Sequence, residues 1–148
     1  MANNEIKVLI FTVNGEFYAT DIMQVERILG YEQNVKIPDC PDFVDGMINY
    51  EGGILPIISI AKRFHIEESK ISKDSKIIVT KQEKGKFGII VDVVSEVKDI
   101  DKNEIEAPPE VVSGISKRYI QGLIKIDKKI IIFLDFASIL TEEEKSLL

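Results

Sequence analysis

The sequence contains few of the residues that reactive or metal-binding sites need. Its 148 residues include one cysteine, one histidine and no tryptophan. Cys40 cannot form an internal disulfide, which favours a reducing, cytoplasmic setting. Zinc sites usually combine several Cys and His ligands, and His65 has no second histidine to join it. We interpret His65 as a surface residue and expect neither a metal nor another cofactor.

The sequence also lacks a membrane-spanning stretch and a strong positive charge. No apolar run approaches the roughly 18 to 20 residues that cross a bilayer, and the N-terminus has no signal-peptide pattern. The net charge of −6 disfavours nucleic acid, because phosphate binding needs a concentrated basic surface. Hydrophobic residues make up 45% and charged residues 30%, as in one soluble globular unit. We therefore expect no nucleic acid and no direct membrane insertion.

Carboxylates are the remaining candidates for catalysis. Asp92, Asp99 and Asp101 have the chemistry for paired acid–base work. Asp99 and Asp101 alternate with apolar residues, however, and a strand end that faces water explains them as well. A phosphate-binding glycine loop with its lysine is missing from the sequence. A binding module is the favoured interpretation, and a small carboxylate-dependent enzyme is the alternative of a different class.

Turn signals divide the chain into short strands. Residues 7–13 and 16–20 are rich in β-formers and flank Asn14-Gly15, a two-residue hairpin signal. Two further hairpins are predicted over residues 76–93 and 121–135. This spacing of short strands favours an all-β barrel or sandwich.

Other segments carry helix or loop signals. Residues 136–148 are predicted to form a C-terminal helix, in which Thr141 and Glu144 have the spacing of a capping box. Pro41 lies near a possible helix start. Pro56 lacks an N–H, so its strand is expected at an edge or a bulge. The polar residues 65–75 are the expected connection between two lobes.

The glycine-marked centre of the chain resembles the central motif of CheW-type chemotaxis adaptors. The motif reads Gly46-Met47-Ile48-Asn49-Tyr50-Glu51-Gly52-Gly53, followed by Ile54-Leu55-Pro56-Ile57-Ile58. Weaker matches continue in order along almost the whole chain; they cover residues 9–13, 18–25, 28–31, 41–46, 64, 88–94, 105, 109–110, 119–123 and 131–135.

This resemblance implies a single CheW-like domain over residues 1–148. Its fold would be all-β, with two SH3-like five-stranded β-barrel subdomains packed together, some strand exchange and a short C-terminal helix. Residues 21–29 have helical spacing with Asp21 as a possible N-cap. The resemblance instead implies a brief turn there and a strand that starts near Val25.

The resemblance also implies a non-catalytic scaffold without cofactors. Such a scaffold couples the cytoplasmic tips of methyl-accepting chemoreceptors to the regulatory domain of a CheA-type histidine kinase, and it is cytoplasmic but recruited to membrane receptor arrays. The implied receptor-binding candidates are Val25, Arg27, Ile28 and Glu51. The implied kinase-binding candidates are Ser75, Lys76, Ile77, Glu106 and Val111. The implied structural glycines are Gly46, Gly52, Gly88 and Gly122.

Two charged positions depart from the family pattern. The family usually has Glu two residues beyond the position of Val25 and Arg within its central motif, whereas this chain has Arg27 and Glu51. If the two residues face each other, the ion pair survives with its order reversed. We therefore predict a structural pair between Arg27 and Glu51 and an altered receptor specificity.

Two readings of the same fold remain open. The chain is either an independent adaptor, which the start at Met1 and the predicted terminal helix favour, or a CheA-like regulatory domain. An adaptor of a non-flagellar chemosensory system is a variant of the first reading. Glu106 and Val111 stand where the family often has a basic residue and a large aromatic, so the contact made by these two positions is expected to differ.

Overall fold

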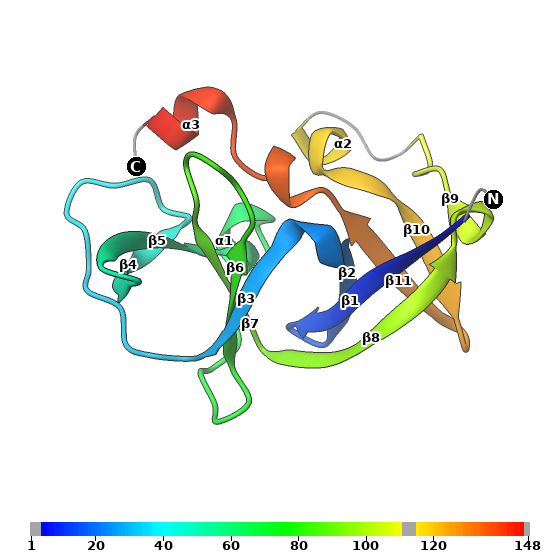
Figure 1. Ribbon diagram of the computed structural model, residues 1–148, viewed down its shortest axis with the longest axis horizontal. Helices are drawn as coiled ribbons and strands as arrows, with labels where there is room; N and C mark the ends of the chain where they lie inside the picture. Colours follow the sequence, from blue (N-terminus) through cyan, green and yellow to red (C-terminus); the bar gives the residue numbers. More distant parts are fainter. Residues whose placement is uncertain (1–3, 111–114, 147–148) are drawn as a thin grey trace.

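The computed structural model describes residues 4–110 and 115–146 and contains two β-sheets (Figure 1). The six-stranded sheet has the order β8-β1-β2-β11-β10-β9. Its strands are β1 (Glu5–Val13), β2 (Glu16–Asp21), β8 (Val93–Asp101), β9 (Ile105–Glu106), β10 (Ile120–Ile126) and β11 (Lys129–Leu134). The five-stranded sheet has the order β3-β6-β7-β5-β4. Its strands are β3 (Val25–Gly30), β4 (Val44–Tyr50), β5 (Gly53–Ser59), β6 (Lys76–Thr80) and β7 (Gly88–Val91).

The all-β prediction is confirmed, with one sheet larger than expected. The extra strand is β9, a two-residue strand that pairs with β10. Short helices separate some of the strands: the 3-10 helices η1 (Ile22–Gln24), η2 (Lys102–Glu104) and η3 (Phe136–Ser138), and the α-helices α1 (Ile60–Arg63), α2 (Ile115–Tyr119) and α3 (Glu142–Ser146).

The predicted hairpins form where the turn residues accept left-handed backbone angles. Asn14 and Gly15 have φ of 51° and 79°, as a type I′ turn between twisted strands requires. Asp127 and Lys128 have φ of 47° and 69° and join β10 to β11 in the same way. The ambiguous segment 21–29 forms η1, capped by the Asp21 side chain, and then β3 from Val25. The turn-and-strand prediction for this segment is confirmed.

The chain changes sheet at two places, and neither is the one predicted. It enters the five-stranded sheet through η1, between β2 and β3, and leaves it at Asp92, between β7 and β8. Residues 65–75 instead lie between α1 and β6, so they connect strands β5 and β6 of a single sheet. The reason is that β2 pairs in parallel with β11, which places the N-terminal hairpin in the sheet of the C-terminal strands.

One apolar core extends from one sheet to the other. Phe11 of β1 and Leu134 of β11 belong to the same buried cluster as Ile58 of β5 and Ile78 of β6. Each sheet also has a smaller cluster of its own. The shared layer means that the two sheets are held together mainly by buried apolar surface.

Several local expectations are corrected. The C-terminal segment forms η3 and the short α3 rather than one helix. No helix begins at Pro41, where the chain makes turns before β4. β5 lies inside its sheet, between β7 and β4. Pro56 is tolerated because the hydrogen-bonded pairing of β5 with β7 begins only at the next residue, Ile57. A backbone N–H at position 56 would therefore have no partner on β7.

Candidate partner-binding surface

Arg27 and Glu51 lie close together at the edge of the five-stranded sheet. Arg27 is on β3, an edge strand, and Glu51 is in the turn between β4 and β5. The Arg27 Nη2 atom is 3.9 Å from the Glu51 Oε2 atom, and each side chain is 55% exposed. This separation is at the long end for an ion pair, and water screens both groups. The pair therefore adds more to the charge pattern of the surface than to stability.

A charge-neutralising double-mutant cycle measures how much this pair contributes to stability. We expect a coupling energy of about 0 to 1 kcal/mol between Arg27→Gln and Glu51→Gln, because exposed pairs are worth little. The coupling should decrease further in high salt. Urea unfolding of the four proteins in the cycle provides the measurement, and a coupling above about 2 kcal/mol would show that the pair is a major structural contact.

A second charged cluster stands beside this pair. The Tyr50 hydroxyl donates to Glu26 Oε2 at 2.7 Å, and Lys86 Nζ lies 2.7 Å from Glu26 Oε1. The Arg27 guanidinium and the Lys86 ammonium each lie 5.8 Å from the centre of the Tyr50 ring. Desolvation and the bond to Glu26 raise the pKa of Tyr50 to about 12, so its hydroxyl keeps its proton well into the alkaline range. The bonds from Lys86 and Tyr50 lower the pKa of Glu26.

The sequence did not predict this cluster because strand alternation is interrupted there. The register between β3 and β6 shifts between Val25 and Arg27, which marks a β-bulge or similar irregularity. Glu26 and Arg27 are consecutive, yet both approach Tyr50. A regular strand would point them to opposite faces, and no sequence signal marks the irregularity.

Apolar side chains extend the surface next to the charges. Ile28 of β3 is 39% exposed, and Met23 and Ile54 are each 69% exposed. A hollow next to this surface is lined by Tyr50, Glu51, Ile54, Leu55, Pro56, Glu83, Gly85, Lys86 and Lys145. Val25 is half-buried and packs against the shared core, so it supports the surface from below. Exposed apolar groups rimmed by charges are typical of protein-binding surfaces.

The kinase-binding candidates are not exposed as one group. Ser75 and Ile77 have exposed fractions of 2% and 0%, and Ile77 packs in the core of its sheet. Both side chains are therefore buried in this structure. Lys76 between them is half-buried. Glu106 is exposed on the other sheet, 3.4 Å from the Lys125 ammonium, and Val111 lies outside the described residues.

The candidate glycines fill positions where a side chain has no room or where the backbone turns sharply. A Cβ at Gly46 would lie 2.6 Å from the Val35 carbonyl oxygen, and one at Gly122 would lie 2.7 Å from the Glu106 carbonyl oxygen. A Cβ at Gly88 would lie 2.7 Å from Ile77 Cγ2. Gly52 has φ of 78° in the turn that carries Glu51, a conformation that glycine adopts without strain.

The carboxylates considered for catalysis each make a local structural contact. Asp92 Oδ2 accepts the Asn14 N–H at 2.7 Å, and Asp99 pairs with Lys7 at 2.8 Å. Asp101 caps η2 through the Asn103 N–H. Over residues 4–110 and 115–146, no three Cys, His, Asp or Glu side chains are grouped to hold a metal ion. In the same part of the chain, no helix is long and apolar enough to cross a membrane.

Two sheets that share one core, with an exposed surface of mixed character on an edge strand, define the molecule as a two-sheet β-fold module. Comparison with known proteins identifies the family within this class. Residues 7–144 match the family described as the CheW-like domain. The chain belongs to the CheW family of chemotaxis scaffold proteins.

Individual relatives agree with this assignment. A chemotaxis protein CheW from Klebsiella aerogenes is 33% identical over 94% of this chain and 84% of its own length. One from Treponema pallidum is 29% identical over 96% of this chain and 86% of its own length. The crystal structure of the scaffolding protein TtCheW from Thermoanaerobacter tengcongensis superposes with a TM-score of 0.86 at 36% identity, covering 97% of this chain and 92% of that one.

Proposed function

We propose that this chain is a non-catalytic adaptor that couples the cytoplasmic tips of chemoreceptors to a CheA-type histidine kinase on the cytoplasmic side of the membrane. Membership of the CheW family supports the scaffold role. The surface made by Arg27, Ile28 and Glu51 supports the receptor contact, because it is exposed and combines apolar and charged groups. The chain would act as one domain of two packed halves.

The receptor contact is assigned to β3 and the β4–β5 turn. Ile28 would supply apolar contact, while Arg27 and Glu51 would select partners by charge. Since the order of the two charges is reversed relative to the family pattern, a receptor suited to this chain would carry the matching charges. Such a partner is favoured by attraction, and others are rejected by like-charge contacts.

The kinase contact is assigned to the strand end at Lys76, with Glu106 as a second contact on the six-stranded sheet. Lys76 is the partly exposed member of its group, and the buried Ser75 and Ile77 would hold its strand in place. Glu106 would meet a positively charged partner group by exchanging its exposed ion pair with Lys125 for one with the partner. The two positions lie on different sheets, so one adaptor could bind two neighbours.

Replacing Ile28 tests the receptor assignment. We expect Ile28→Glu to weaken binding of a chemoreceptor cytoplasmic fragment about tenfold or more, because a charge would replace an apolar contact. The matched control is Ile130→Glu, since Ile130 is 58% exposed but lies on β11 of the other sheet. Titration calorimetry of the three proteins supplies the affinities. Unchanged affinity in Ile28→Glu, or an equal loss in both variants, would contradict the assignment.

A further inference from the structure

The C-terminal segment connects the two halves of the molecule, which are the six-stranded sheet and the five-stranded sheet with their connections. We define the C-terminal latch as residues 135–146, which follow β11 of the six-stranded sheet. Figure 1 shows the latch leaving β11 and ending with α3 beside the five-stranded sheet. Ile139 and Leu140 of the latch are 0% and 2% exposed and join the shared core. The latch therefore starts on one half and is anchored on the other.

Arg63 makes the anchoring contact on the side of the five-stranded sheet. Its Nη1 and Nη2 atoms donate to the two oxygens of Glu144 at 2.9 and 2.8 Å, and its Nε donates to the Ile139 carbonyl at 2.9 Å. The Arg63 side chain is only 9% exposed, and its guanidinium lies 4.9 Å from the centre of the Phe43 ring. Bidentate arginine–carboxylate pairs of this kind are strong and directional.

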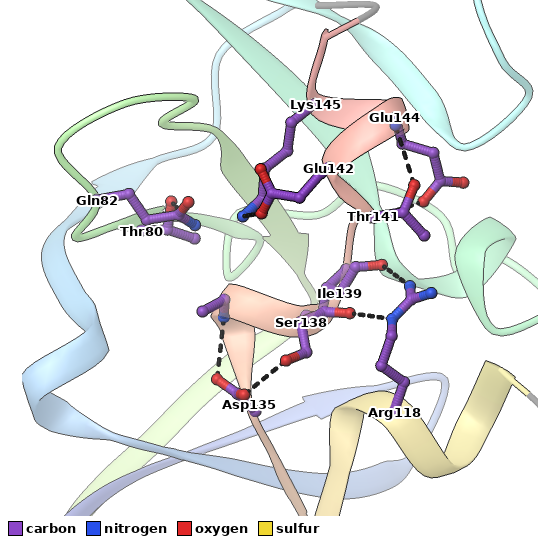
Figure 2. A network of polar contacts seen from close by, with 11 residues as sticks. Thr80, Gln82, Arg118, Asp135, Ser138, Ile139, Thr141, Glu142, Glu144 and Lys145 are labelled. Atoms are coloured by element: carbon purple, nitrogen blue, oxygen red, sulfur yellow. Dashed lines mark hydrogen bonds and ion pairs between the residues drawn. The ribbon is translucent and has the colours of Figure 1, made fainter.

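The half that contains the six-stranded sheet also contacts the C-terminal latch. Arg118 of α2 donates from Nε to the Ser138 carbonyl at 3.0 Å and from Nη2 to the Ile139 carbonyl at 3.4 Å (Figure 2). The Ile139 carbonyl thus accepts from Arg63 and from Arg118, which come from opposite sides of the boundary. Two guanidinium groups on one carbonyl make this point of the latch sensitive to the position of both halves.

The start of the latch is tied to the point where the chain changes sheet. Gln24 is the last residue of η1, between β2 and β3. Its Nε2 donates to Asp135 Oδ1 at 2.6 Å, and its Oε1 accepts the Phe136 N–H at 2.8 Å. These bonds fix one end of the latch at the boundary and leave α3 as its other end.

The α3 helix depends on its contacts. It has five residues, Glu142–Ser146, and isolated helices of that length are not stable in water. Its support comes from the capping box, in which the Thr141 hydroxyl accepts the Glu144 N–H at 3.0 Å and Glu144 Oε1 accepts the Thr141 N–H at 2.8 Å. Arg63 and the Lys145 side chain, which lies close to Gly85 in the β6–β7 connection, add to it. Segments held by so few contacts open at a low free energy, before the sheets unfold.

We propose that the C-terminal latch sets the angle between the two sheets, with Arg63–Glu144 as the contact that closes it. Opening this contact would release α3 while both sheets and the shared core stay folded, and the range of angles between the sheets that the shared core allows would widen. The consequence for signalling rests on the proposed function: Lys76 and Glu106 lie on different sheets, so a fixed angle would be needed to present both to neighbouring partners.

Glu144→Gln separates the latch contact from the helix cap. Glutamine also serves in a capping box, so this variant keeps the cap but loses the charge that binds Arg63. Thr141→Ala does the reverse, because it removes the cap hydroxyl and keeps the Arg63–Glu144 pair. The matched control is Lys62→Gln, which removes a neighbouring charge of α1 whose ion pair with Glu68 is exposed.

The test measures the distance between the sheets in the free protein. Spin labels at Ser95→Cys on β8 and Asp74→Cys before β6, in a Cys40→Ser background, report the distance distribution by pulsed electron resonance. We expect one narrow distribution for the parent and for Lys62→Gln, and a broadened or shifted one for Glu144→Gln. Thr141→Ala should change the distribution less than Glu144→Gln does. Amide exchange of each variant shows whether the sheets remain folded.

Either of two results would contradict the proposal that the C-terminal latch sets the angle between the sheets. The first is a Glu144→Gln distribution identical to that of the parent. The second is a loss of amide protection throughout both sheets of Glu144→Gln, which would make the pair a general stability contact. Since no partner is present in these measurements, they test the latch proposal independently of whether the chain binds a receptor or a kinase.

Discussion

Replacing Gly88 with valine is expected to lower the free energy of unfolding by about 3 kcal/mol, at the upper end of overpacking effects. A Cβ at this position would lie 2.7 Å from Ile77 Cγ2, 2.9 Å from Ile57 Cδ1 and 3.3 Å from Leu55 Cδ2. Each of these atoms belongs to a side chain of the buried cluster of the five-stranded sheet. The side chain of valine therefore forces the packed side chains of Ile77, Ile57 and Leu55 to move. Urea unfolding measures the loss.

Gly30→Val is the matched control for this prediction. Gly30 is also a strand residue of the five-stranded sheet, but a Cβ there has no atom within 4 Å. We expect its stability to stay within about 0.5 kcal/mol of the parent. If the two variants were equally stable, close packing around Gly88 would not be the reason for the glycine.

Phe64→Ala is expected to lower the free energy of unfolding by about 3 kcal/mol, the lower end for phenylalanine because Phe64 is half-buried. Its ring stacks on Tyr119 with centroids 4.7 Å apart and lies 5.8 Å from the Tyr18 ring. Tyr18 lies on β2 of the six-stranded sheet and Tyr119 ends α2 just before β10, whereas Phe64 follows α1 after β5. The substitution thus removes apolar contact between the two halves. Thermal unfolding followed by calorimetry measures the effect.

Phe64→Leu separates burial from ring stacking. Leucine keeps most of the apolar volume, so we expect a smaller loss of about 1 kcal/mol, the size of an aromatic pair interaction. A loss in Phe64→Leu as large as that in Phe64→Ala would show that ring geometry dominates. A negligible loss in Phe64→Ala would contradict the role of Phe64 in joining the halves.

Local signals in the sequence predicted the hairpins and the helix cap. Asn14-Gly15 specifies its turn through backbone preference alone, and the Thr141–Glu144 box acts within one helical turn. Such features depend on neighbours in the sequence, so no tertiary information is needed. The C-terminal helix is shorter than expected: η3 ends at Ser138, and α3 starts after its cap Thr141, with the buried Ile139 and Leu140 between the two.

Long-range features were not accessible in the same way. The parallel pairing of β2 with β11 joins residues more than a hundred positions apart and moves the changes of sheet to η1 and Asp92. The burial of Ile77 follows from the inner position of β6, between β3 and β7, which no periodicity in the sequence shows. The Glu26–Tyr50–Lys86 cluster depends on the irregularity in β3. Each of these depends on pairing between distant strands, which local propensity does not encode.

The most direct test of the adaptor account is titration calorimetry of this chain against the regulatory domain of a CheA-type kinase from the same cell. The account predicts saturable one-to-one binding that Lys76→Glu weakens about tenfold, while the control Lys84→Glu, on an exposed residue of the β6–β7 connection, leaves it unchanged. Absence of binding at the highest attainable concentration would contradict the account.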